Sequence, residues 1–539
     1  MRTLGISAFY HDSAAALIRD GELVAAAQEE RFTRRKNDPS FPMHAIRSVL
    51  EIAGEREVDR VVYYERPLPK LERLLETWLA TAPRGFRRFA AAWPTWTDRV
   101  FVERHLRREL GQLGLSAPVS VVGHHDSHAA SAFLPSPFER AAILTVDGVG
   151  EWETATMGVG EGTTVRVQQA LRFPHSLGLL YSAFTSYCGF RVDSGEYKVM
   201  GLAAFGEPRF ADTIREHLID LRPDGSFRLD LRYFDFLAGE RMYSDAFCAR
   251  FGGAAREPES PMSARFEDLA ASIQAVTEDV VARMAAEAVR RAGCRDLCMA
   301  GGVALNCVAN GKLVSEGVVD RLWVQPAAGD AGGALGAALV ASPCRVDLGD
   351  GGLGACAGVD VDVPGIVDAL VAGEVVGLVQ GRMELGPRAL GHRSILADPR
   401  DPAMQDRVNA AVKKRESFRP FAPAVLEERA SEWFELAGAS PYMTQVGAVK
   451  RPLPAVTHVD GTARVQTVGA ENPVFRAILQ GFEARTGCPV LLNTSFNVRG
   501  EPIVRTAEDA ERCFRSTDID VLAVPGRLVR KRPADRAAE

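Results

Sequence analysis

Long apolar runs and a secretory leader are missing from this sequence. It contains no stretch of about 18 consecutive apolar residues, the length at which a helix crosses a bilayer. The first residues, MRTLGISAFYHDSAAAL, lack the cationic segment and apolar run of a signal peptide. We therefore expect a cytoplasmic protein with no membrane partner.

Paired cysteines and a surplus of basic residues are missing as well. The nine cysteines run from Cys188 to Cys513 and include no CxxC pair, which excludes a disulfide framework and a zinc-finger array. The net charge is −6, and eight of the 64 basic residues are lysines. Broad nucleic-acid binding needs a basic surface, so we expect no nucleic-acid partner. No GxxxxGK[ST] motif occurs, which excludes a P-loop.

Apolar β-type runs alternate with helical patterns along the 539 residues, which predicts an α/β protein. Near the start, Asp20-Gly21 separates two apolar runs and predicts a hairpin. A similar strand–turn–strand opening returns at AAILTVDGVGEWETATMGVG, where a strand ends at Asp147. Two such openings predict a duplicated domain, the layout of the actin/hexokinase-like ATPase fold. Residues 266–292 predict a long amphipathic helix.

The pattern changes after residue 341. The stretch SPCRVDLGDGGLGACAGVDVDVPG is rich in Gly and Asp and lacks periodicity, which is typical of a boundary between domains. We expect a first domain at 1–342, a linker at 343–364 and a second α/β domain at 365–539, whose last residues we expect to be frayed.

The segment HHDSHAASAF, from His124 to Phe133, holds three of the ten histidines. His124 and His128 are four residues apart, so a helix would place them on one face. Two such imidazoles can bind Fe, Zn or Mn when carboxylates complete the site, and Asp147 and Asp330 are the natural suppliers. The alternative is that these histidines cap or pack a helix.

Two glycine-rich junctions follow predicted strands, GGVALN at 301–306 and GDAGGALGAA at 329–338. Small residues let a ligand approach the backbone closely, so the junctions predict a nucleotide or acyl-nucleotide site. Close packing of a helix on a sheet explains them equally well. The residues concerned are Gly301, Gly302, Asn306, Asn310, Gly332 and Gly333.

Basic residues gather in the second half, in GRMELGPRALGHRSILADPR and AAVKKRESFRPFAP. Gly, Pro and apolar residues interleave these charges, unlike a solvated helix face. Guanidinium groups suit phosphate and carboxylate oxygens, so we predict a polyanion site rather than a solvated surface. Its candidate residues are Arg382, Arg388, Arg393, Lys413, Lys414, Arg415, Arg419, Arg464 and, in LLNTSFNVRGEP, Ser495.

The chain resembles the NodU/CmcH-type O-carbamoyltransferases of nodulation factors and antibiotics over nearly its whole length. The similarity is carried by FYHDSAAAL, EERFTRRKNDPSFP, HHDSHAASAF, VDGVGEW, SGEYKVMGLAAFGEP, GGVALNCVANGKL, GDAGGALGAA, GPRALGHRSILADPR, KKRESFRPFAP and LLNTSFN. The resemblance implies an actin/hexokinase-like domain similar to the tRNA threonylcarbamoyladenosine transferase component, followed by a YrdC-like domain.

The resemblance also implies the chemistry. The second domain converts carbamoyl phosphate and ATP with Mg²⁺ to carbamoyl adenylate, and the first transfers the carbamoyl group to a hydroxyl of a small natural-product or sugar-containing acceptor. The implied metal is Fe(II), or another divalent transition metal, on His124, His128, Asp147 and Asp330. We expect His11 or Asp12 as the base, with Lys413, Arg419 and Ser495 catalytic in the second domain. Arg388, Arg393, Lys414 and Arg464 would bind the phosphates.

Other interpretations stay open at this point. A carbamoylating enzyme that acts on a macromolecule and a nucleotide-binding actin-like sensor or scaffold are the alternatives. The oligomeric state is undetermined, with a homodimer as one option. A stripe at helical spacing (Phe86, Phe89, Trp93 and Trp96) favours core packing over an acceptor cleft. In ERFTRRKND, Arg34, Arg35 and Lys36 are further candidates to contact the nucleotide or the acceptor.

Overall fold

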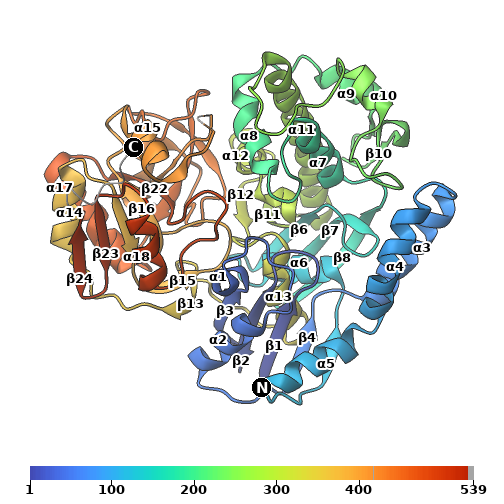
Figure 1. The fold of residues 1–539 in the computed structure, drawn as a ribbon, viewed down its shortest axis with the longest axis horizontal. Helices are drawn as coiled ribbons and strands as arrows, with labels where there is room; N and C mark the ends of the chain where they lie inside the picture. The colour runs from blue at the N-terminus through green and yellow to red at the C-terminus, as the bar shows by residue number, and fades with distance from the viewer. Residues whose placement is uncertain (417, 532–539) are drawn as a thin grey trace. The chain divides into compact units, whose positions relative to one another are not determined.

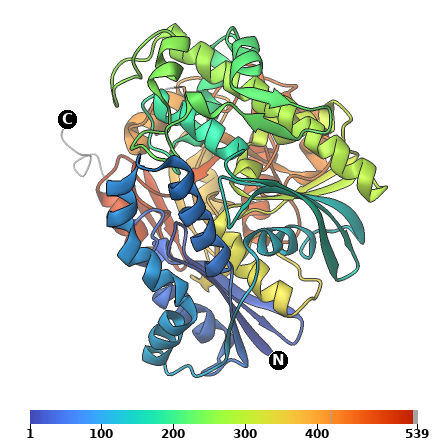
Figure 2. The same ribbon diagram turned by 90° about the vertical axis from the view of Figure 1, so that its right-hand side faces the viewer.

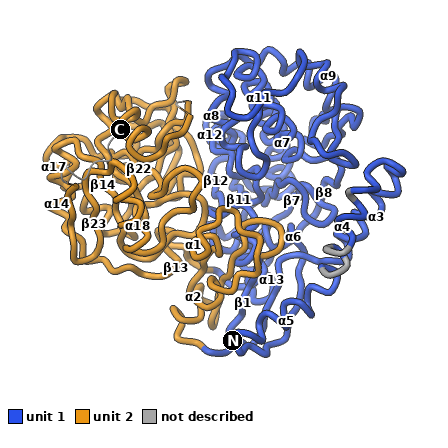
Figure 3. The backbone as a smooth tube through the Cα atoms, in the orientation of Figure 1, with its two compact units in different colours: residues 1–7, 56–345 blue, residues 8–55, 346–539 orange. Residues whose placement is uncertain are grey.

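The structure is a computed structural model that describes residues 1–416 and 418–531, with side chains at all of these positions except 88, 92, 94, 95, 97 and 98. The chain forms two compact units (Figure 3). Unit 1 comprises residues 1–7 and 56–345, and unit 2 comprises residues 8–55 and 346–539. No helix in the described part of the chain is both long and apolar enough to span a bilayer.

Unit 1 begins with a set of parallel strands: β1 (Arg2–Ser7), β4 (Arg60–Tyr63) and β5 (Val119–Val121), with β4 between the other two. Between β4 and β5 the chain forms α3 (Pro67–Thr81), α4 (Phe86–Val100) and α5 (Val102–Gln112). Helices α3 and α4 lie side by side, as Figures 1 and 2 show in blue, and Trp78 stacks on Phe89 between them.

A second sheet of unit 1 has the order β12-β11-β6-β7-β8. Strands β6 (Arg140–Val146), β7 (Glu153–Glu161) and β8 (Thr164–Arg172) form an antiparallel meander. Strands β11 (Asp296–Ala300) and β12 (Arg321–Val324) are parallel to β6. Along the chain, β1 is followed by an antiparallel pair, β2 (Ala14–Arg19) and β3 (Glu22–Gln28), and then by the parallel strands β4 and β5. In the same way, β6 is followed by the antiparallel pair β7–β8 and then by the parallel strands β11 and β12. This repeat confirms the duplicated actin/hexokinase-like fold.

The helices of unit 1 follow from its apolar pattern. Helix α11 (Ala264–Ala292) confirms the helix predicted at 266–292, and its large apolar residues are buried. Helices α6 (His124–Phe133) and α13 (Asp330–Ala341) pack with almost no space between their backbones: a Cβ at Gly336 would lie 1.8 Å from the carbonyl oxygen of Ser127. The other elements are α7 (Leu177–Tyr187), α8 (Glu196–Leu202), α9 (Ala211–His217), β9 (Ile219–Leu221), β10 (Phe227–Leu229), α10 (Asp245–Arg250) and α12 (Cys307–Ser315).

Unit 2 contains a hairpin and two helices from the early chain: β2 (Ala14–Arg19), β3 (Glu22–Gln28), α1 (Glu30–Thr33) and α2 (Met43–Ala53). The turn predicted at Asp20-Gly21 is confirmed, and both residues have positive φ, 51° and 88°. Type I′ turns require this conformation.

The rest of unit 2 is built on a seven-stranded mixed sheet of order β21-β17-β22-β16-β14-β23-β24. Its strands are β14 (Val376–Val379), β16 (Arg393–Ala397), β17 (Ala422–Leu426), β21 (Gln466–Val468), β22 (Val490–Ser495), β23 (Val521–Val524) and β24 (Arg527–Arg530). Smaller sheets join β13 (Gly352–Cys356) with β15 (Arg382–Glu384), and β18 (Phe434–Glu435) with β19 (Val446–Val449) and β20 (Thr462–Arg464). The helices are α14 (Val363–Val371), α15 (Met404–Val408), α16 (Ala430–Trp433), α17 (Pro473–Thr486) and α18 (Ala507–Arg515). The predicted frayed tail lies largely outside the described residues.

Candidate functional site

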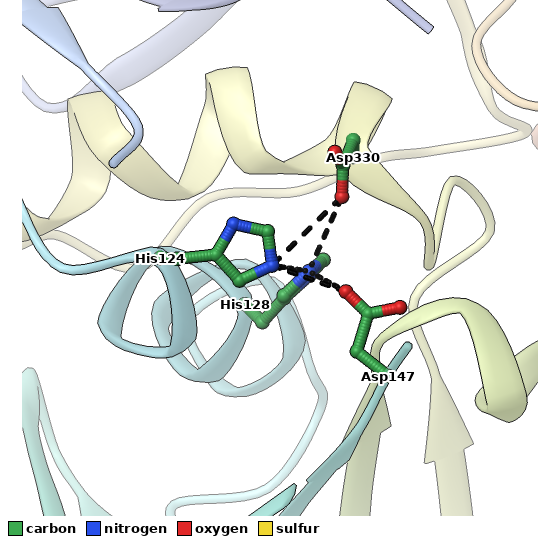
Figure 4. A group of neighbouring side chains, drawn as sticks. All are labelled: His124, His128, Asp147 and Asp330. Atoms are coloured by element: carbon green, nitrogen blue, oxygen red, sulfur yellow. Dashed lines mark hydrogen bonds and ion pairs between the residues drawn. The ribbon is translucent and has the colours of Figure 1, made fainter. Parts of the chain in front are cut away.

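Helix α6 positions the two histidines as the spacing predicted. The helix begins at His124, directly after Gly123 in an extended conformation, so His128 follows one turn later on the same face. Both side chains are buried. Asp147 follows the last residue of the buried strand β6, and Asp330 is the first residue of α13. Two helix starts and a strand end therefore direct four side chains to one point (Figure 4).

The four side chains approach closely enough to share a cation. The Nε2 atoms of His124 and His128 lie 3.1 Å apart. Asp147 Oδ2 is 3.0 Å from Nε2 of His124 and 3.3 Å from that of His128. Asp330 Oδ1 is 3.9 and 3.7 Å from the same two atoms. All four ligand atoms lie within 4.8 Å of one another.

This arrangement is electrostatically unusual without a cation. Burial lowers the pKa of His128, but hydrogen bonds with Asp147 and Asp330 outweigh it and raise the pKa to about 9. Burial raises the pKa of Asp147, but its hydrogen bonds to the two histidines hold it well below its usual value. The metal-free cluster therefore keeps a proton in the position that a cation would occupy.

The donor set fits a divalent transition metal. Two imidazole nitrogens and two carboxylate oxygens suit Fe, Zn and Mn better than Ca²⁺ or Mg²⁺, which prefer oxygen ligands alone. The carboxylates are also held by further partners. The Tyr64 hydroxyl donates to Asp330 Oδ2 at 3.1 Å, and the Gly302 N–H donates to Asp147 Oδ1 at 3.0 Å. Such contacts orient metal ligands.

His125 lies between the two histidines in sequence but faces elsewhere. Its Nδ1 lies 2.6 Å from Thr145 Oγ1 and its Nε2 lies 3.0 Å from the carbonyl oxygen of Glu153. Burial lowers its pKa to about 3, so this imidazole is neutral. Its role is to join α6 to strands β6 and β7.

Two residues beside the cluster were not among the predicted site residues. Glu151 is buried and accepts hydrogen bonds from the His124 N–H and from the Arg66 backbone and side chain. Tyr64 stands in VVYYER, a segment with no feature that points to the histidines. Glu151 lies in VDGVGEW, four residues after Asp147, and that proximity was the available signal.

The glycine junctions lie at close packing contacts. A Cβ at Gly301 would lie 2.3 Å from the carbonyl oxygen of Val146, one at Gly332 2.3 Å from that of Ala327, and one at Gly333 2.8 Å from the Tyr64 ring. Asn306 caps α12, and the Asn310 amide donates to the Ala304 carbonyl. The packing alternative accounts for these residues, and their nucleotide role stays a prediction.

In unit 2, Lys413 ends a π-helical turn, residues 409–413, and is buried. Its ammonium donates to Asn497 Oδ1 at 2.8 Å, to the Asn497 carbonyl at 3.0 Å and to Ser495 Oγ at 3.2 Å, and also contacts the Ser495 carbonyl. Burial, and then the charges of Arg415, Arg419 and Lys36, hold the pKa of Lys413 well below its usual value. This buried amine is held entirely by neutral oxygens, beside other cations.

Arg393, in contrast, is used by the fold. It is buried, and its guanidinium donates to backbone carbonyls of Gln380, Gly381, His392, Ala355 and Arg505. Burial lowers its pKa to about 10. Every guanidinium nitrogen of Arg393 therefore has a carbonyl partner, which is the arrangement of a structural arginine rather than of a phosphate ligand.

The remaining predicted residues of unit 2 are more accessible. Arg388, Arg419 and Arg464 are half-buried, Lys414 is exposed, and Arg419 lies 3.5 Å from Glu416. His11 Nδ1 lies 3.0 Å from Asp12 Oδ2, and Asn37 donates to Asp12. Arg382 is engaged by the carbonyls of Val24, Leu353 and Gly354.

The aromatic stripe in α4 is only partly a core. Phe86 and Trp93 are 57% and 39% exposed, so core packing is wrong for these two residues. Phe89 stacks on Trp78 at 4.5 Å between ring centroids. Trp96 lines a pocket with Tyr63, Glu65, Lys70 and Arg99, among other residues, in which Lys70 and Glu65 form a buried ion pair at 2.7 Å.

Family comparisons cover most of the chain. The carbamoyltransferase N-terminus family matches residues 2–339, and the carbamoyltransferase C-terminus family matches residues 367–531. Nodulation protein NolNO of Sinorhizobium fredii is 39% identical over 98% of this chain and 80% of its own length. NolO of Bradyrhizobium diazoefficiens is 41% identical over 77% and 79%. Nodulation protein U of Rhizobium tropici is 32% identical over 93% and 91%.

Among solved structures, HypF of T. kodakarensis is 14% identical, covers 63% of this chain and 48% of its own, and has a TM-score of 0.32. The ROK hexokinase of Thermus thermophilus is 18% identical, covers 64% of this chain and all of its own, and has a TM-score of 0.29. The two family matches and the identity to the nodulation proteins decide the assignment: this chain belongs to the carbamoyltransferase family.

Proposed function

We propose that this carbamoyltransferase converts carbamoyl phosphate and ATP to carbamoyl adenylate and transfers the carbamoyl group to a hydroxyl of a small natural-product or sugar-containing acceptor, in antibiotic biosynthesis or a related pathway. The observation that carries the proposal is the convergence of His124, His128, Asp147 and Asp330 in unit 1. A buried lysine with a lowered pKa in unit 2 supports a second, separate site.

The first reaction belongs to unit 2. Carbamoyl phosphate, ATP and one water give carbamoyl adenylate, phosphate and pyrophosphate, so the carbamoyl oxygen becomes bonded to the α-phosphorus. Mg²⁺ accompanies ATP and neutralises phosphate oxygens. Lys413 and Ser495 stand where a ligand oxygen can replace Asn497 or the Ser495 carbonyl as the partner of the ammonium. Arg388, Lys414, Arg419 and Arg464 supply further positive charge.

The second reaction belongs to the proposed transfer domain, residues 1–342, whose candidate metal ligands lie in unit 1. An alcohol is a weak nucleophile, and adenylation provides the carbamoyl carbon with a good leaving group. His124, His128, Asp147 and Asp330 would hold Fe(II) or another divalent metal, which when bound supplies Lewis-acid polarisation of carbamoyl or phosphate oxygens. We propose His11 as the base that removes the acceptor proton, because histidine is the most common general base in enzymes, with Asp12 as the alternative; both residues belong to residues 8–55 of unit 2.

The domain boundaries follow the same assignment: 1–342 for transfer, 343–364 as linker and 365–539 as a YrdC-like domain. We place the protein in the cytoplasm, without nucleic-acid or membrane partners.

The decisive experiment measures pyrophosphate release with ATP and carbamoyl phosphate supplied together and singly. Release that requires both supports the proposal, and mass spectrometry then identifies which alcohol gains a carbamoyl group. A nucleotide-binding scaffold would release no pyrophosphate, and an enzyme for macromolecules would carbamoylate RNA or protein but no small alcohol.

A further inference from the structure

The segment from Gln28 to Arg34, here called the N-terminal clamp, contains a buried arginine and a half-buried one whose contacts lie far away in sequence. Both belong to unit 2. Their partners lie in two turns, residues 385–392 and 496–506, that carry or adjoin predicted site residues. Within the clamp, only Arg34 was itself a predicted site residue.

The first contact fixes the turn at 385–392. The Arg31 guanidinium donates to the Gly386 carbonyl at 2.6 Å, and the Gly386 N–H donates to Gln28 Oε1 at 3.1 Å. Both peptide groups of Gly386 are therefore held by the clamp. Arg388, a predicted phosphate ligand, stands two residues later on the same turn. Arg31 is 1% exposed, so this contact is internal to the unit.

The second contact fixes the turn at 496–506. Arg34 donates through Nη1 to the Ile503 carbonyl at 2.6 Å and through Nη2 to the Pro502 carbonyl at 2.7 Å. Glu501 lies 3.8 Å from the same guanidinium. A bidentate guanidinium fixes direction as well as distance. In addition, the Arg505 guanidinium lies 5.0 Å from the centroid of the Phe32 ring.

The second turn leads directly to Lys413. The Asn497 amide donates to the Glu501 carbonyl at 2.6 Å, and the Asn497 side-chain oxygen accepts from Lys413 at 2.8 Å. Ser495 donates to the same oxygen at 2.7 Å. A short series of hydrogen bonds and two or three residues of backbone thus join Arg34 to the ammonium of Lys413.

We infer that the N-terminal clamp is a positioning element of the carbamoyl-adenylate site, in which Arg34 fixes the turn that holds Lys413 and Arg31 with Gln28 fixes the turn that carries Arg388. The inference rests on the proposed function. It also revises the expectation for Arg34. The sequence made Arg34 a candidate to contact the nucleotide or the acceptor, but in the structure its guanidinium donates to backbone carbonyls of the protein.

The contacts of the clamp are among those that group residues 8–55 with unit 2, although the N-terminal family match includes these residues. A site built from loops needs supporting contacts that hold its side chains within about 0.5 Å of the productive geometry. Here the supporting arginines come from a segment more than 300 residues earlier in the sequence. Adenylate formation then depends on residues outside the C-terminal family region.

Arg34→Ala in the full chain tests the inference, because this side chain is partly exposed, whereas removal of the buried Arg31 threatens folding. The matched control is Arg19→Ala. Arg19 also donates to a backbone carbonyl, that of Ala53, and pairs with Glu55, but both partners lie within residues 8–55. Arg34→Lys keeps the charge and can reach one of the two carbonyls.

We expect kcat/KM for pyrophosphate release to fall about tenfold or more in Arg34→Ala, because two carbonyls lose their partner and the turn loosens. Arg34→Lys should recover part of the loss, and Arg19→Ala should resemble the parent. Transfer from supplied carbamoyl adenylate should be unchanged. Hydrogen exchange should become faster at 496–506 in Arg34→Ala and stay unchanged in the control.

Two results overturn the inference. One is unchanged exchange at 496–506 in Arg34→Ala. The other is faster exchange with unchanged pyrophosphate release, which would make the contact structural only. A parent enzyme that releases no pyrophosphate refutes the proposed function instead, and the exchange measurement still decides whether Arg34 holds the turn.

Discussion

Gly336→Ala should separate the two helices that carry three of the four candidate metal ligands. A Cβ at position 336 would lie 1.8 Å from the Ser127 carbonyl oxygen and 2.9 Å from its Cα, both backbone atoms of α6. Real Cβ atoms essentially never approach closer than 3.0 Å. The helices must therefore move apart by at least 1.2 Å, the difference between 3.0 and 1.8 Å.

That movement acts directly on the cluster. Ser127 precedes His128 and follows His124 by three residues, while α13 begins at Asp330. Metal ligands tolerate displacements of about 0.2 Å. We therefore expect Gly336→Ala to bind Zn²⁺, a redox-inert probe, at least about tenfold more weakly. Overpacking of this kind costs about 1–3 kcal/mol of the free energy of unfolding, which lowers Tm by roughly 2–5 °C for a unit of this size.

Gly329→Ala is the control for this prediction. Position 329 adjoins Asp330, but a Cβ there would meet nothing within 4 Å, and its φ of −72° suits any residue. Zinc affinity is measured by calorimetry and Tm by differential scanning fluorimetry. Equal Zn²⁺ affinity in Gly336→Ala and Gly329→Ala would refute the argument that backbone contact between α6 and α13 sets the ligand geometry.

Three more predictions follow from the two sites. His128→Ala should weaken Zn²⁺ binding at least about 100-fold and abolish transfer, while pyrophosphate release continues. His125→Gln is the control: it changes a neutral imidazole that faces Thr145, and elemental analysis should still find the metal. Transfer by a metal-free His128→Ala enzyme would contradict the assignment. The pKa of His128 is raised to about 9 in the metal-free cluster, so metal must displace a proton at pH 7. The Zn²⁺ affinity should therefore rise roughly 50-fold from pH 7 to 9, because half of the imidazole is still protonated at pH 9. Calorimetry in two buffers should show about one proton released per metal at pH 7, and a pH-independent affinity would exclude this coupling. Lys413→Ala should reduce pyrophosphate release at least about 100-fold, while the variant still transfers the carbamoyl group from supplied carbamoyl adenylate. A variant that could not use supplied carbamoyl adenylate would argue against separate reactions in the two units.

The part of the structure that short sequence patterns determine was predictable. Asp20-Gly21 and the helix at 264–292 depend on local preferences, and His124 and His128 depend on helical periodicity. Asp147 and Asp330 were expected because carboxylates complete a site with two histidines. Apart from this convergence, these features need no knowledge of long-range packing.

Contacts between distant segments were not predictable from residue type. Arg393 and Arg388 stand five residues apart in the same Gly-rich stretch, yet Arg393 donates to five backbone carbonyls. A guanidinium N–H can donate to a backbone carbonyl or to a phosphate oxygen, so the sequence cannot separate the two uses. Tyr64 and Glu151 were not predicted because the residues that they contact lie 266 and 27 positions away in the sequence.

The position of the clamp in the chain suggests how the two proposed reactions depend on each other. Residues 8–55 begin directly after β1 and end shortly before β4, two adjacent parallel strands of unit 1. The excursion into unit 2 is therefore anchored at both ends in the unit that we assign to transfer. If unit 2 forms carbamoyl adenylate as proposed, Arg31 and Arg34 make that site depend on a segment whose two ends continue into β1 and β4. Carbamoyl adenylate is an unstable mixed anhydride, so a protein benefits if it forms this compound only when the unit that consumes it is folded. Replacing residues 28–34 would remove that dependence.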